Sequence, residues 1–209
     1  MAWVDAVRVL GGDERVARAG AAELAARYAE PHRRYHNGDH VRAVLRDSAD
    51  LARELELSVP ERALLTLAAA AHDVIYDGRP GLDERASAAW AGEWLKRAGL
   101  AEVHIARVES LVLATMSHSA PKDDATALAL LDADLAILGS DPETYDRYRD
   151  AVRAEYSTVD DAAWRVGRGA VLSTLLAREP LYATAAARVR WEAAAKRNLA
   201  RELSECALA

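Results

Sequence analysis

The sequence contains little of what disulfide-rich or membrane-spanning proteins require. Cys206 is the only cysteine among the 209 residues, so one chain can form neither a disulfide nor a cysteine-based zinc site. The longest apolar stretch, 63–71, is too short to span a bilayer. Residues 1–14 carry charges of both signs, which is not the pattern of a secretory signal peptide. We therefore expect a cytoplasmic protein with no membrane partner.

Residues that interrupt or oppose helices are also scarce. The chain has 11 glycines, 6 prolines and no phenylalanine, and no long Gly/Ser/Pro linker divides it. Hydrophobic residues make up 51% and charged residues 29%, a globular composition dominated by the helix formers Ala, Leu, Arg and Glu. The formal net charge of -6 disfavours a nucleic acid as the main partner.

Helical periodicity with no convincing strand predicts an all-α fold, a single domain over residues 1–209. We expect a core of about 30–140, on which C-terminal helices within 141–205 pack. Residues 60–74 are apolar nearly all round from Ala63 to Ala71, which is typical of a helix in the centre of a bundle. The other expected helices cover about 13–29, 39–57, 83–97, 101–116, 126–138, 142–156, 160–178 and 183–203.

His72 and Asp73 stand side by side at the end of the most apolar helix. Burying an imidazole and a carboxylate there is costly unless a partner compensates. A divalent cation would compensate both, because neutral imidazole and carboxylate are good ligands for such ions. Taken alone, the pair is better explained by a core histidine followed by a capping aspartate.

Two further polar clusters interrupt apolar helices. His36 and His40 are four residues apart near the start of one predicted helix, so they share a face if that helix begins early enough. Asp132 and Asp134 lie inside the apolar run 127–138, where carboxylates need a partner. A single metal ion shared by these clusters explains all of them.

These residues resemble a known family. His40, His72-Asp73 and a later aspartate are similar to the H…HD…D pattern of the HD-domain metal-dependent phosphohydrolases. Tyr35-His36-Asn37-x-x-His40 resembles the YHNxxH signature of cyclic-nucleotide phosphodiesterases, in which the first histidine is the general acid and the second a metal ligand. The segments that look like a bacterial branch of predicted HD phosphohydrolases are 72–76, 84–88, 132–139, 145–156 and 168–176. Asp83 departs from that branch, which has Asn there.

The resemblance implies a metal site of His40, His72, Asp73 and one of two aspartates. Asp134 fits best because it follows a small residue and precedes a leucine, and Asp132, pointing to another face, is the alternative. By the same resemblance Asp73 also takes part in catalysis, His36 protonates the leaving oxygen, and Tyr35 and Asn37 lie at the substrate.

For three further residues, the sequence does not decide between a functional and a structural role. Glu84 would orient the attacking water or support a ligand histidine, or is simply a first-turn glutamate favoured by the helix dipole. His118 would bind a second metal or a phosphate, or is a loop histidine. Arg168, flanked by glycines, would reach a substrate phosphate. His32 and His104 are taken as surface residues.

A metal held this way favours hydrolysis of a phosphate ester. Without sulfur ligands, the expected cofactor is Mg, Mn, Fe, Co, Ni or Zn. The expected partner is a small phosphomonoester or phosphodiester, nucleotide-like in kind. The sequence leaves open whether the protein forms a homodimer. Two alternatives are an HD-type di-iron oxygenase and a catalytically idle helical module that binds a nucleotide or a protein.

Overall fold

The computed structural model describes residues 2–208, and every regular element among them is a helix, so the predicted all-α fold is confirmed. The chain divides into two compact units, Met1–Ala133 and Asp134–Ala209. The boundary between them lies at the end of one helix. The expected single domain with a core of about 30–140 stays a prediction.

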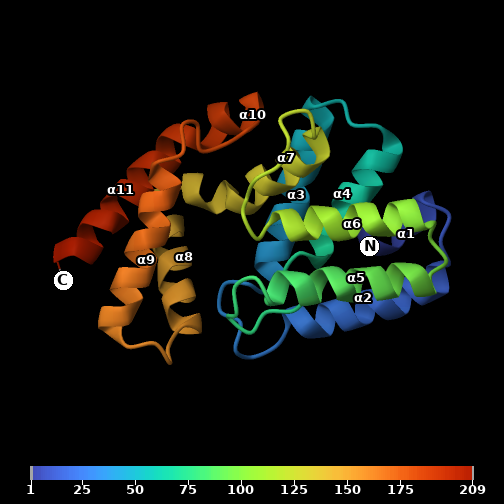
Figure 1. Cartoon of the computed structure of the whole chain (residues 1–209), viewed down its shortest axis with the longest axis horizontal. Coiled ribbons are helices and arrows are strands. Elements are labelled where there is room, and N and C mark those ends of the chain that lie inside the picture. Colours follow the sequence, from blue (N-terminus) through green and yellow to red (C-terminus); the bar gives the residue numbers. More distant parts are fainter. Residues whose placement is uncertain (1, 209) are drawn as a thin grey trace. The chain divides into compact units, whose positions relative to one another are not determined.

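The first unit is built from seven helices, shown in Figure 1 from blue to yellow. Helices α5 and α6 lie side by side, and α2 lies along the other side of α5. The helices are α1 (Ala2–Val9), α2 (Glu14–Tyr28), α3 (Gly38–Glu54), α4 (Val59–Ala71), α5 (Asp83–Arg97), α6 (Glu102–Ala114) and α7 (Ala125–Asp134).

Helix α4 forms the centre of this unit, as its apolar sequence predicts. Every residue from Leu67 to Ala71 is buried, and α4 packs against α1, α3, α5 and α6. Its start is fixed by a capping box, in which Ser58 and Glu61 each accept a hydrogen bond from the other's backbone N–H. The helix ends three residues earlier than expected, so His72 is its C-cap and not part of its body.

Helix α1 was not expected from the sequence. Trp3, Val4, Ala6 and Val7 are buried on one face of it, which packs against α4 and α2. With 8 residues, α1 is too short for its periodicity to stand out, and its stability comes from this packing.

The second unit contains a short 3₁₀ helix η1 (Leu135–Gly139), helices α8 (Pro142–Glu155) and α9 (Asp161–Leu176), and a C-terminal run. That run comprises α10 (Ala185–Ala187), a π-helical turn η2 (Arg188–Glu192) and α11 (Ala193–Leu208). Helix α11 packs against α9 and η1, and the Asn198 side chain donates to the carbonyls of Leu138 and Ser140. Over the described residues, none of the helices has both the length and the apolar character needed to cross a membrane.

Candidate metal centre

Four side chains from separate parts of the chain converge on one point. One ligand atom each of His40, His72, Asp73 and Asp134 lies within 4.8 Å of the others. His40 is in the first turn of α3, His72 and Asp73 follow α4, and Asp134 is the last residue of α7. Both histidines are buried, while the two aspartates are only partly covered. This group could hold a metal ion, and it contains the aspartate favoured by the sequence.

The distances within the group fit a single small cation. His40 Nε2 is 3.0 Å from His72 Nε2 and 3.3 Å from Asp73 Oδ2, and His72 Nε2 is 3.1 Å from Asp73 Oδ2. A cation bound at about 2.1 Å separates neighbouring ligand atoms by about 3.0 Å in octahedral and about 3.4 Å in tetrahedral geometry. The donor set therefore suits a single divalent ion.

The orientation of the His72 ring supports the same conclusion. His72 Nδ1 lies 2.9 Å from the carbonyl oxygen of Ala69. Because a carbonyl can only accept, this contact places a proton on Nδ1, so that with a cation bound Nε2 would turn its lone pair to the ion beside the other three side chains. Its position at the C-terminal end of α4 also favours a nearby positive charge.

Asp73 is ionised despite its surroundings. Burial by itself would raise the pKa of the Asp73 carboxyl, but it is outweighed by the charge of His72 and by hydrogen bonds from His40 and His72, with a smaller contribution from His36. The pKa therefore lies well below its usual range, and the carboxylate is ready to bind a cation at any physiological pH.

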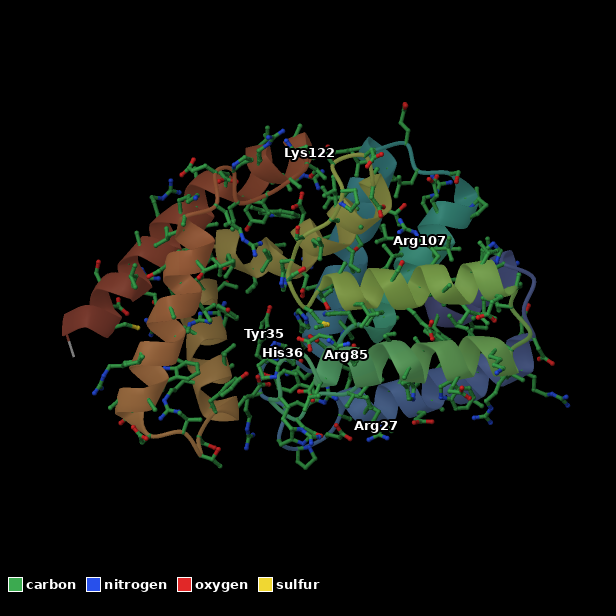
Figure 2. All side chains as sticks on the ribbon, in the orientation of Figure 1. Arg27, Tyr35, His36, Arg85, Arg107 and Lys122 are labelled. Carbon is green, nitrogen blue, oxygen red and sulfur yellow. The ribbon has the colours of Figure 1, made fainter. Side chains whose placement is uncertain are left out.

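The segment before α3 places His36 beside the ligands in an unexpected way. Helix α3 begins at Gly38, so His36 lies outside the helix and does not share a helical face with His40. The two rings are nevertheless 5.6 Å apart. His36 stacks on Tyr76 with ring centroids 4.0 Å apart, and Tyr35 packs against both His36 and His40. Tyr35 and His36 are labelled beside each other in Figure 2.

Asn37 has a structural role that the motif resemblance does not suggest. It is the N-cap of α3: its Oδ1 accepts from the Asp39 N–H at 2.8 Å, and its Nδ2 donates to the Arg34 carbonyl at 3.0 Å. Both ends of the amide are thus used to start the helix that carries His40. Its contact with a substrate stays a prediction.

The backbone that follows His72 is held by side chains that sequence reasoning missed. Arg33 donates to the carbonyls of Asp73 and Val74 at 2.7 and 2.8 Å. Ser87 Oγ bonds both the N–H and the carbonyl of Ile75, and His32 Nε2 lies 2.8 Å from the Tyr76 carbonyl. His32 is exposed, as expected, yet it contributes to this framework. The only sequence signal for Arg33 is its position beside the tyrosine-histidine motif.

Asp83 completes the framework at the residue where the resembling branch has Asn. It is buried, and its Oδ2 accepts from the N–H groups of Asp77 and Arg79 at 2.9 and 2.8 Å. Its neighbour Glu84 accepts from the Gly81 N–H at 2.6 Å. That contact agrees with the first-turn role of Glu84, and its catalytic role stays a prediction.

The remaining candidates lie outside the four-residue group. Asp132 is buried but is not part of it. His118 is half-buried in the turn after α6, with a backbone φ of 46°. Arg168 is buried in the second unit, where its guanidinium binds both carboxylate oxygens of Glu202. The predicted phosphate contact of Arg168 gains no support, because these donors are already engaged.

Comparisons with protein-family models, with curated proteins and with solved structures found no match to this chain. Its function is therefore inferred from the geometry of the site and from the resemblance of its motifs.

Proposed function

We propose that this protein is a metal-dependent phosphohydrolase that acts on a small phosphate ester, nucleotide-like in kind. The observation that carries the proposal is the convergence of His40, His72, Asp73 and Asp134 within 4.8 Å. A divalent cation bound there supplies water activated near neutral pH and stabilises charge on the phosphoryl oxygens.

The chain's own residues provide the rest of the chemistry. Two carboxylates and two neutral imidazoles leave a divalent cation formally neutral, so a phosphate dianion needs a further positive group. His36 suits this role because it lies next to His40 and is only partly covered. Protonated, it would bind the phosphate and give its proton to the leaving oxygen. Its stacking on Tyr76 would keep the ring in place.

Replacing His36 by Gln tests this division of roles. Because His36 acts on the leaving group and is not a ligand, His36→Gln should lower kcat by about 10²- to 10⁴-fold and leave the affinity for Mn²⁺ almost unchanged. The measurements are steady-state kinetics with a phosphate ester and calorimetric titration with Mn²⁺. His104→Gln on α6, a histidine outside the group, is the matched control and should change neither.

The proposal itself is tested with chelator-stripped protein and a panel of nucleotides and other phosphate esters. We expect release of phosphate or nucleoside monophosphate that requires added metal and is lost in Asp73→Ala. Turnover that persists without metal would refute the proposal. A visible absorption band together with two iron ions per chain would indicate a di-iron oxygenase. Ligand binding that needs no metal and leads to no turnover would indicate an idle binding module.

A further inference from the structure

Arg33 is a buried cation next to the candidate centre, and neither the motif resemblance nor the mechanism above uses it. Its side chain is 0% exposed. The guanidinium donates to three backbone carbonyls, those of His36 at 3.0 Å, Asp73 at 2.7 Å and Val74 at 2.8 Å. Its Nε also donates to Glu30 Oε2 at 3.1 Å, which supplies the balancing negative charge.

Two of these carbonyls belong to residues of the site. His36 is the candidate acid and Asp73 a candidate ligand, and they lie 37 positions apart in the chain. Arg33 joins their peptide groups through one nitrogen, Nη1, which donates to both. The position of one peptide group therefore fixes that of the other.

The choice of arginine follows from the geometry. Several acceptors converge on one buried point, and a guanidinium offers five N–H donors in a rigid plane, whereas an ammonium offers three on a flexible stem. The cation also lies over the rings of Tyr28 and Tyr76, at 5.2 and 5.8 Å from their centroids. Tyr76 is the ring on which His36 stacks, so Arg33 supports His36 both through its carbonyl and through this ring.

We propose that Arg33 is a positioning residue that holds the Asp73 ligand and the His36 acid in register around the metal. This inference rests on the proposed function for the role of His36, and on the four-residue group for the role of Asp73.

A merely structural arginine would affect stability and leave the site's metal affinity unchanged. Arg27, labelled in Figure 2, provides the matched control. It pairs with the same Glu30, at 3.3 Å, through a side chain that is 42% exposed. Arg33→Gln and Arg27→Gln each remove a cationic partner of Glu30. Only the first also releases the peptide groups of His36 and Asp73.

The experiment is a Mn²⁺ titration of chelator-stripped wild type, Arg33→Gln, Arg33→Lys and Arg27→Gln, at a temperature where circular dichroism shows each fully folded. We expect Arg33→Gln to bind Mn²⁺ about 10- to 100-fold more weakly, as is usual when a group that orients a ligand is lost, with kcat lowered as well. Arg33→Lys should fall between it and the wild type, and it carries the test if Arg33→Gln does not fold. Arg27→Gln should stay within about twofold of the wild type.

Two results separate failure of this inference from failure of the proposed function. If the wild type binds Mn²⁺ and the folded Arg33 variants bind it equally tightly, Arg33 is not a positioning residue, and the metal site stands. If the wild type binds no Mn²⁺, the proposed function and this inference are both overturned.

Discussion

Asp132 and Asp134 stand two residues apart at the end of α7, and their carboxylates leave the helix in different directions. Asp132 is 3% exposed, yet only Asp134 joins the histidines and Asp73. Degree of burial is therefore a poor guide to which carboxylate joins the candidate metal group. What matters is the direction in which each side chain leaves the helix, because a ligand atom must come within about 2 Å of an ion.

This pair allows a matched test at the scale of single residues. Asp134→Asn removes a charged ligand and should weaken Mn²⁺ binding by at least about tenfold, since the ligand carboxylates supply the negative charge that the ion needs. Asp132→Asn makes the same chemical change beside the site and should leave the affinity within about twofold. Calorimetric titration of both variants provides the measurement. Equal losses in the two would contradict the assignment of Asp134.

At the scale of elements, the loop between α4 and α5 is ordered by polar side chains as well as by the apolar packing of Val74 and Ile75. Asp83 holds the N–H groups of Asp77 and Arg79 through a single oxygen, Oδ2. Each such hydrogen bond contributes about 0.5–1.5 kcal/mol net, so this carboxylate contributes to the stability of the loop that follows the ligands.

Substituting Asp83 should distinguish the stabilisation due to its hydrogen-bond acceptor from that due to its negative charge. Asp83→Ala leaves both N–H groups without their acceptor and should lower the free energy of unfolding by about 1–3 kcal/mol. Asp83→Asn keeps an oxygen at the same place and should cost less than about 1 kcal/mol, since a neutral acceptor still serves both donors. Urea unfolding followed by tryptophan fluorescence measures both. A loss in Asp83→Asn as large as in Asp83→Ala would show that the charge matters more than the hydrogen bonds.

Helix α7, which ends in Asp134, is fixed at its other end by Asp124. The Arg107 guanidinium binds both oxygens of Asp124, and the Ala127 N–H donates to Asp124 Oδ1 at 3.0 Å. The hydrogen bond from Arg107, with that backbone bond, holds the pKa of Asp124 below its usual range although partial burial opposes this. The position of Asp134 thus depends on an ion pair between α6 and the start of α7.

A lowered pKa in the folded state gives stability a definite pH dependence. The unfolded chain binds a proton at Asp124 near its ordinary pKa of about 3.9, before the folded chain does. The stabilisation is therefore complete above about pH 5 and is lost as the pH falls through the folded-state pKa. Asp124→Asn should cost about 1.5 kcal/mol at pH 7 and show a weaker pH dependence between about pH 5 and 3. Urea unfolding at several pH values tests this, and parallel curves for the two proteins would contradict it.

At the scale of the whole molecule, the second unit has its own buried polar network. Glu202 is 3% exposed and accepts from Arg168 Nε at 2.7 Å and from the Tyr145 hydroxyl. Burial and the Glu202 carboxylate raise the pKa of Tyr145 well above its usual range, so the hydroxyl remains a donor. The network joins α8, α9 and α11 within this unit.

Breaking one partner of this network should be costly. Glu202→Gln leaves the buried Arg168 charge without its counter-ion and should lower the free energy of unfolding by about 3 kcal/mol. Replacing both partners by apolar residues, Arg168→Met with Glu202→Leu, should recover much of that loss because no charge is then left unpaired. Thermal and urea unfolding of the single and double variants are the measurements. A double variant less stable than Glu202→Gln would contradict this account.

Much of the fold could be predicted from the sequence because helix signals are local. Several residues mark helix ends within a few positions of where the structure has them. They are Ser58 with Pro60, Gly99, and Asp141 with Pro142. Helix α1 could not be predicted, since its eight residues are stabilised by contacts with α4. The ends of α4 and α7 were also placed too late, because a C-cap at His72 and a change to 3₁₀ geometry at Leu135 are set by tertiary contacts.

The candidate ligands could be found because polar residues in apolar helices stand out. The groups that position them could not. Arg33, Ser87 and Asp83 bond to backbone atoms, and nothing in the sequence says which backbone atoms a side chain will meet. Asn37 shows the converse, since a residue of a recognisable motif proves to be a helix cap.

The most direct test of the central claim is anomalous diffraction from crystals soaked in Mn²⁺. This account predicts one strong peak at about 2.0–2.3 Å from Nε2 of His40, Nε2 of His72 and a carboxylate oxygen each of Asp73 and Asp134. No peak among these side chains in well-diffracting crystals, or a peak bound only by other residues, would contradict it.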